Sequence, residues 1–194
     1  MNGQQGDDEW ERLWDERLAA LEAVFGPAED LVGHAPVPLE LGPEAGGAAD
    51  VVYFKGWRPG RLTVTADLLG IEGPLANEQG AYELAICHRD DERWGPNIIS
   101  RLANYVFESP LNPGETMDIG SAVPQGSSVA AFLFHDLARF EFRGEPAGVL
   151  LCIGITEDEL DACRDGRTDQ VLEALRANGV FPYTDLRRRS VLGS

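Results

Sequence analysis

Residues 82–120 read YELAICHRDDERWGPNIISRLANYVFESPLNPGETMDIG, and the rest of the chain is expected to fold around this stretch. An apolar strand is predicted over 82–88, where it runs into an acidic turn. A helix is predicted over 97–108, beginning after Pro96, and a Pro-Gly loop then leads into a short strand. The helix is expected to bury Ile98, Leu102, Tyr105 and Val106. This pattern indicates a folded domain, but its composition and spacing name no function.

The length and composition of the chain favour one globular domain. Its 194 residues are enough to bury a core without disulfide bonds. Gly and Pro number 22 and 12, which exceeds their average usage and favours a sheet-rich, loop-rich fold over a helical bundle.

The segment before the central stretch is predicted to hold one helix and two strands. Residues 1–6 are expected to be disordered, and Asp7 or Asp8 is expected to cap a helix that ends near Phe25. Strands are predicted over 50–55 and 61–67, joined by the turn from Gly56 to Gly60. A short strand is also considered at 37–41.

The segment after the central stretch is predicted to hold a hairpin and two helices. Residues 128–135 and 147–155 are nearly continuous apolar runs, typical of strands covered on both faces. Residues 139–143 alternate between polar and apolar and precede a Gly-Glu-Pro turn, which predicts an antiparallel hairpin.

Thr156 and Glu159 have the spacing of a capping box, so a helix is expected to follow to about Arg164. A second helix is expected from Thr168. The domain is therefore placed at 7–180, and 181–194 is expected to be a C-terminal tail with solvated arginines.

The charge of the chain limits its partners. The net charge is −17 and the isoelectric point is about 4.4, which argues against nucleic-acid and anionic membrane surfaces as partners. Residues 1–50 alone carry twelve acids and two arginines. These features suit a basic protein partner or serve solubility alone. Membrane-span and signal-peptide patterns are absent from the sequence, so a cytoplasmic location is expected.

The sequence gives no clear catalytic or metal-binding constellation. Cys87 and His88 are neighbours on a strand, so their side chains point to opposite faces and cannot form a nucleophile–base dyad. The three Cys and three His lack the short spacing of zinc sites, so the cysteines are read as reduced core thiols. No metal and no cofactor are predicted.

Two alternatives to protein binding stay open. The acids Asp90, Asp91 and Glu92 in the turn could serve with His88 in a small hydrolase-like enzyme. The acidic composition could also mimic nucleic acid.

The strand over 61–67 is the candidate binding element. It places Arg61, Thr63, Thr65 and Asp67 on one face, which predicts a side near solvent and makes the strand a candidate sheet edge. Trp94, in the acidic turn beside the helix start, is either a lid on the core or an exposed anchor for a partner.

Between residues 61 and 167, roughly, the sequence resembles the Suppressor of fused family. The matching pieces are the following: TVTADLLG, YELAICHRDDERW, NIISRLANYVFE, LNPGETMDIG followed by Val123-Pro124, VAAFLF and ITEDELDACRDG. Where the family usually carries a turn like SGMS, this chain has ADLLG at 66–70, so no binding residue is carried over.

The resemblance implies an α+β fold with a mixed, mostly antiparallel sheet flanked by helices, in a single domain. It also implies protein binding without enzyme activity. Two-domain animal members hold Gli transcription factors by clamping a peptide strand between their domains, and this chain is similar only to the first domain. Stand-alone bacterial members are often proposed as immunity proteins of toxin systems. We therefore expect a non-enzymatic protein-binding domain with a basic partner, such as a toxin.

Overall fold

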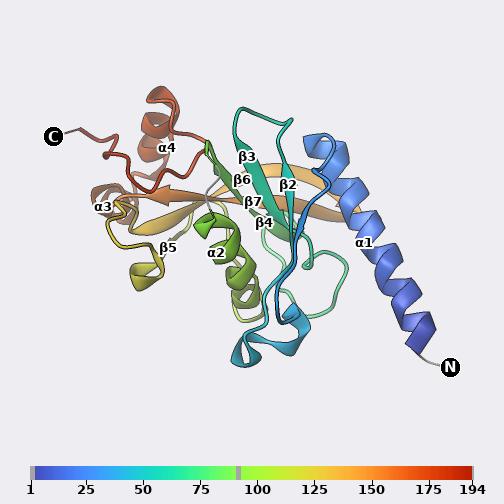
Figure 1. Cartoon of the computed structure of the whole chain (residues 1–194). Helices are drawn as coiled ribbons and strands as arrows, with labels where there is room; N and C mark the ends of the chain where they lie inside the picture. The colour runs from blue at the N-terminus through green and yellow to red at the C-terminus, as the bar shows by residue number, and fades with distance from the viewer. Residues whose placement is uncertain (1–2, 91–92, 194) are drawn as a thin grey trace.

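The computed structural model describes residues 3–90 and 93–193, and the side chains from residue 9 onward within these ranges. Its centre is a seven-stranded sheet in the order β1-β2-β3-β4-β7-β6-β5 (Figure 1). The strands are β1 (Val32–Gly33), β2 (Val51–Phe54), β3 (Arg61–Thr65), β4 (Ala81–His88), β5 (Thr116–Asp118), β6 (Ala131–Phe142) and β7 (Glu145–Ile155). Among these seven described strands only β4 and β7 pair in parallel, so the predicted α+β fold with a mixed, mostly antiparallel sheet is confirmed.

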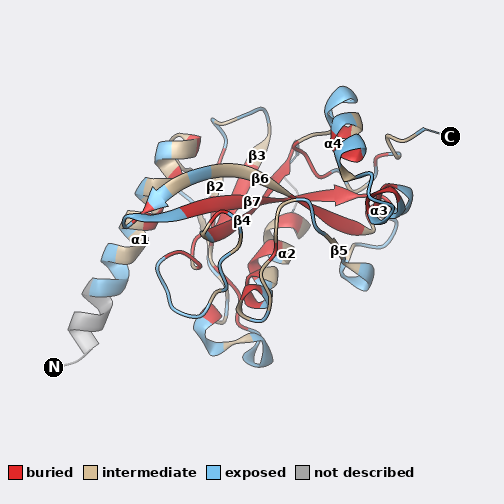
Figure 2. Ribbon diagram, turned by 180° about the vertical axis from the view of Figure 1, so that it is seen from behind, coloured by how far each residue is buried: buried red, intermediate tan, exposed pale blue. Residues whose placement is uncertain are grey.

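Helices cover both faces of the sheet. The α-helices are α1 (Gly3–Phe25), α2 (Trp94–Leu102), α3 (Glu157–Arg164) and α4 (Thr168–Ala177). Side chains of α1, α3 and α4 pack on one face in a single apolar cluster, and α2 packs on the other face. The strands β4 and β7 are therefore buried along most of their length (Figure 2).

The long hairpin of β6 and β7 confirms the predicted one. The chain reverses at Arg143 and Gly144, whose φ angles are 54° and 82°. Two successive residues with positive φ match the right-handed twist of the strands they join. Residues 139–142 continue the apolar run as one strand, with a register shift between Asp136 and Ala138.

Two predicted helix starts differ from the structure. The first helix begins at Gly3, earlier than Asp7 or Asp8 and within the segment expected to be disordered. The second begins at Trp94, ahead of Pro96, because the first turn of a helix has no intrahelical acceptor for the N–H that proline lacks.

The buried face of the second helix also differs from the prediction. It continues as a 3₁₀ helix, η3 (Ala103–Phe107), and buries Ile99, Ala103 and Val106. Of the predicted core positions there, Val106 is buried, whereas Tyr105 is 40% exposed.

The strand considered at 37–41 is wrong. The last three of these residues form a 3₁₀ turn, η1 (Leu39–Leu41), and a second turn, η2 (Pro43–Ala45), follows it. Pro36 and Pro38 have no N–H for a sheet ladder, which favours the turn. None of the described helices has the length and apolar character that a membrane span requires.

Candidate functional site

The strand predicted as an open edge lies inside the sheet. β3 pairs with β2 on one side and with β4 on the other. Thr63 and Thr65 are 1% and 0% exposed, so neither can contact a partner in the folded protein. The alternation was misread because a polar residue on a strand can serve a buried hydrogen bond as well as solvent.

The two ends of β3 have different surroundings. Arg61 donates from Nε to Glu29 Oε1 at 2.9 Å, and its guanidinium lies over the ring of Tyr53. It therefore ties the sheet to the segment before β1. Asp67, just beyond β3, accepts a hydrogen bond from the backbone N–H of Asp50 at 2.7 Å and reaches a surface groove.

A buried polar cluster beneath that groove was missed in the sequence. Glu83 on β4 is fully buried, and its Oε1 accepts hydrogen bonds from the backbone N–H groups of Leu68 and Leu69, each at 2.9 Å. The Thr65 hydroxyl lies 2.5 Å from its Oε2. Burial raises the pKa of Glu83 to about 7. The sequence feature that could have revealed this cluster is Glu83 itself, a lone acid inside an otherwise apolar strand.

Arg17 of α1 completes this cluster. Its side chain is 2% exposed and donates to the carbonyls of Leu69 at 2.5 Å and Ala66 at 3.0 Å. The buried position of Arg17 could have been inferred from the spacing of Leu13, Arg17 and Leu21, which places a charge in the apolar stripe of the helix. The cluster fixes α1 to the loop that follows β3.

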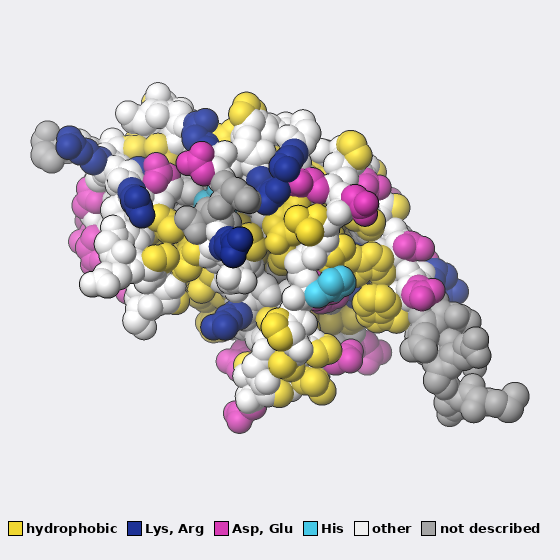
Figure 3. Space-filling view, viewed as in Figure 1, with side chains coloured by type: hydrophobic (Ala, Val, Ile, Leu, Met, Phe, Trp, Pro, Cys, Tyr) yellow, Lys and Arg dark blue, Asp and Glu magenta, His cyan; other side chains and the backbone are white. Residues whose placement is uncertain are grey.

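The groove above the cluster has a volume of about 400 Å³. It lies between α1 and the segment that leads into η1. Its polar lining is Arg17, His34, Glu40, Asp50 and Asp67, and its apolar lining is Trp10, Leu13, Ala35, Pro38, Leu39 and Ile71. Figure 3 shows hydrophobic side chains gathered between α1 and the turns η1 and η2, with acidic side chains at their border.

The two edge strands of the sheet are the two-residue β1 and, at the opposite end of the strand order, β5. In its antiparallel pairing with β6, residues 115, 117 and 119 face β6, because Phe134 donates to Glu115 and Ile119 donates to Ala130. The backbone groups of Thr116 and Asp118 therefore point away from the sheet.

Trp94 lies beside this edge. Its ring packs against Phe132 of β6 with centroids 5.8 Å apart, and its Nε1 donates to the carbonyl of Ala122 at 2.7 Å. Ala122 ends the turn η4 (Gly120–Ala122), which follows β5 directly. Trp94 thus holds the loop that continues from the open strand, in addition to covering part of the core.

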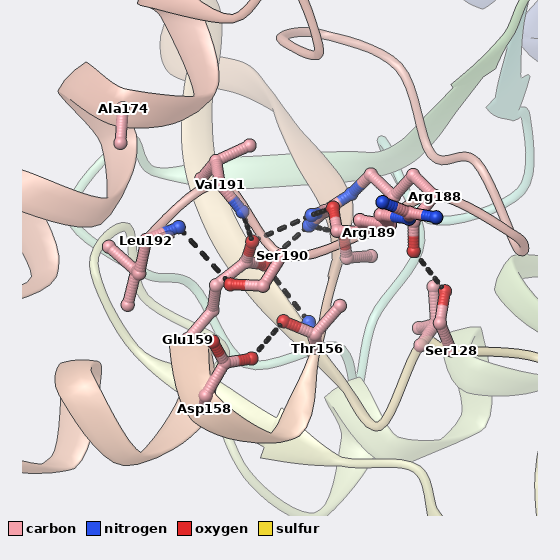
Figure 4. Close-up of polar contacts among 12 residues, drawn as sticks. Ser128, Thr156, Asp158, Glu159, Ala174, Arg188, Arg189, Ser190, Val191 and Leu192 are labelled. Carbon is pink, nitrogen blue, oxygen red and sulfur yellow. Dashed lines mark hydrogen bonds and ion pairs between the residues drawn. The ribbon is translucent and has the colours of Figure 1, made fainter. Parts of the chain in front are cut away.

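The segment after 180 packs on the domain. Arg188 is 9% exposed and forms a two-contact ion pair with Glu159, in which its NH1 donates to Oε1 at 2.6 Å (Figure 4). It also donates to the carbonyl of Gly154 at 3.0 Å, and Val191 N–H donates to Glu159 at 2.8 Å. The expectation of solvated arginines is therefore wrong for Arg188.

Glu159 keeps its predicted role at the start of α3. The capping box with Thr156 is confirmed, and the Thr156 N–H donates to Glu159 Oε2 at 3.0 Å. The same carboxylate thus caps a helix and binds the C-terminal segment, and only the first of these could be read from a local motif.

Two residues of the enzyme alternative, His88 and Asp90, line a second cleft of about 410 Å³ together with residues 183–187. His88 is 5% exposed, and its Nδ1 lies 2.8 Å from the carbonyl oxygen of Thr184, to which it donates. This contact joins β4 to the C-terminal segment. Asp90 is exposed, and Asp91 and Glu92 lie outside the described residues.

The cysteines and histidines are dispersed through the fold. Cys87, Cys152 and Cys163 are buried free thiols, and burial raises the pKa of each of them. Within residues 3–90 and 93–193, no three Cys, His, Asp or Glu side chains are grouped closely enough to hold a metal ion.

Comparison with solved structures shows the same fold in several proteins. A Suppressor of fused homologue from Neisseria gonorrhoeae FA 1090 has a TM-score of 0.69 at 15% identity, covering 95% of this chain and 99% of that one. The Sufu protein of a Sufu–Fu complex has a TM-score of 0.67 at 16% identity, covering 94% and 91%. Drosophila Suppressor of Fused has a TM-score of 0.54 at 14% identity, and the match spans 83% of this chain and 42% of that protein.

A search among curated protein sequences gives no significant match. The sequence model of the Suppressor of fused protein family matches residues 63–189, which is more than half of the chain. The match ends inside the C-terminal segment, consistent with the packing of Arg188 on the domain. The chain belongs to the Suppressor of fused protein family.

Proposed function

We propose that this protein is a non-enzymatic protein-binding domain that uses the open edge of β5 to accept an extended segment of its partner. The observation that carries the proposal is the position of β5 at the end of the sheet, with the backbone of Thr116 and Asp118 directed outward. Such an edge can add a strand through main-chain hydrogen bonds. That a protein of the same fold is found in a complex with Fu supports protein binding as the function.

Trp94 is the proposed anchor beside this edge. It is partly exposed, and aromatic side chains of this kind often contribute most to an interface. Through its hydrogen bond to Ala122, Trp94 also holds the loop after β5, which must keep its position for the edge to stay open.

The edge is tested with a proline at an outward-facing position. Thr116→Pro removes the N–H that points away from β6 and keeps the ladder on the inner side, so binding should fall at least tenfold. Thr116→Ala keeps the amide and is the matched control, which should bind like wild type. The partner is captured from the native host and then titrated as a purified protein against each variant.

Equal binding by the proline variant would exclude the β5 edge as the contact. A hydrolase or nuclease activity lost in His88→Ala or Asp90→Ala would favour the enzyme alternative instead.

A basic partner is the second element of the proposal. The net charge of −17 steers a positively charged protein and raises its association rate more than its affinity. Raising salt from low to physiological strength should slow association several-fold and change dissociation much less, because screening acts over about 8–10 Å. Stopped-flow or surface binding kinetics measure both rates. An association rate that ignores salt would contradict steering.

We further propose an immunity role in the cytoplasm. Three buried free thiols suit a reducing compartment, and the acidic surface suits a basic toxin. The captured partner, expressed alone, should then slow growth of its host, and co-expression of this protein should restore it.

A further inference from the structure

We propose that the groove between α1 and η1 is a second docking site, for a partner segment that presents an arginine or lysine beside an apolar side chain. This inference rests on the proposed protein-binding function but uses a different surface. The groove lies by α1, and β5 lies at the far end of the sheet (Figure 1).

The apolar part of the groove is exposed to solvent. Trp10 is 50% exposed and stacks on Trp14 with ring centroids 5.8 Å apart. Ile71 is 38% exposed across the groove, and Leu41, next to the lining residue Glu40, is 60% exposed. Large apolar side chains that gather at a concave site mark an interaction surface, and a half-exposed tryptophan is a typical anchor.

The charged part of the groove is held in place before any partner arrives. Asp50 accepts from the N–H of Ala35 at 2.8 Å and contacts His34 Nδ1 at 2.6 Å. Asp67 in turn accepts from the N–H of Asp50. Preorganised carboxylates bind a cation without an ordering cost of their own.

The acids of the groove outnumber its fixed positive charge. Arg17 lies 3.6 Å from Asp67, but its guanidinium already donates to two backbone carbonyls and also faces Glu83. Burial and the neighbouring Asp50 and Glu40 carboxylates raise the pKa of Asp67. A partner cation would relieve this repulsion, which is the charge complementarity that selects an arginine or lysine.

The mixture of acids and exposed apolar groups favours an organic cation over a metal ion. The acids stand beside Trp10 and Ile71, and the stem of an arginine or lysine can pack on such surfaces while its head meets the carboxylates. A volume of about 400 Å³ lies at the small end of ligand pockets, which suits one or two side chains rather than a whole domain.

The probe is a ten-residue peptide of arginine and leucine, together with the same peptide in which citrulline replaces arginine. Citrulline keeps the shape of the side chain and removes its charge. The arginine peptide should bind at least tenfold more tightly than the citrulline peptide. Trp10→Ala and Glu40→Gln should each weaken the arginine peptide by at least threefold.

Matched controls separate this site from general attraction to an acidic protein. Tyr105→Ala removes another exposed aromatic side chain, and Asp161→Asn removes an exposed acid on α3; both should bind the peptide like wild type. Thermal unfolding of each variant shows that it is folded.

The indole N–H signals in a ¹⁵N-correlated spectrum report the location, because the chain has four tryptophans. The arginine peptide should shift the signal of Trp10, assigned with Trp10→Phe, and leave that of Trp94 in place. A shift at Trp94 alone, or equal binding by Trp10→Ala, would overturn the groove site and leave the β5 proposal standing. Self-association that is lost in Trp10→Ala, without peptide binding, would place a second copy in the groove and also overturn the inference.

Discussion

Replacing Arg188 with alanine is expected to lower the free energy of unfolding by about 3–5 kcal/mol. The reason is that the carboxylate of Glu159 would remain buried without its ion-pair partner. Glu159 is fully buried, and burial alone would raise its pKa, but the hydrogen bonds from Arg188, Thr156 and Val191, together with the charge of Arg188, lower it overall. Among the described residues Arg188 is the cation paired with Glu159, so its removal leaves a buried charge without that counterion.

Chemical denaturation measures the loss, and the neighbouring residue gives the control. Arg189 is exposed, so Arg189→Ala should change stability by less than about 0.5 kcal/mol. Adding Glu159→Gln to Arg188→Ala should recover part of the lost unfolding free energy, because the glutamine amide leaves no unpaired charge in the core. Equal stability of the two alanine variants would mean that the C-terminal segment is not fixed by this pair.

Local patterns predicted much of the fold. The strands over 50–55, 61–67 and 82–88, the hairpin and the capping box at Thr156 were each visible in a short window, because period and capping are local properties. Strand order was not, since alternation at Thr63 and Thr65 is compatible with either a solvent face or a buried hydrogen bond.

The parts of the site that escaped prediction depend on residues far apart in the chain. The charges of Arg17 and Glu83 act on each other across 66 positions, and Glu159 pairs with Arg188 across 29. Neither pair has a spacing that a sequence can show. Trp94 was expected in the turn before the helix and is instead the first residue of α2, and its contact with Ala122 follows from the path of the loop after β5.

Wild-type protein is expected to lose stability as pH rises from about 4.5 to 7, relative to a Glu83→Gln variant. The folded pKa of Glu83 is raised to about 7 from an ordinary value of 4.5, so between these values the folded protein holds a proton that the unfolded chain has released. Stability falls with pH wherever the folded state binds more protons. The contribution of Glu83 is therefore complete below pH 4.5 and lost as pH rises through 7, by an amount on the order of 3 kcal/mol.

Glutamine mimics the protonated acid, because its carbonyl can accept from Leu68 and Leu69 while its amide donates to Thr65. Both proteins are denatured at several pH values between 4.5 and 8. The free energy of unfolding of the variant, relative to that of wild type, should increase across this range. Glu145→Gln, which changes an exposed acid on β7, is the control and should follow wild type at every pH. If the free energies of unfolding of wild type and Glu83→Gln changed in parallel with pH, Glu83 would be ionised when buried. Arg17 and the three hydrogen-bond donors would then be sufficient to stabilise its charge.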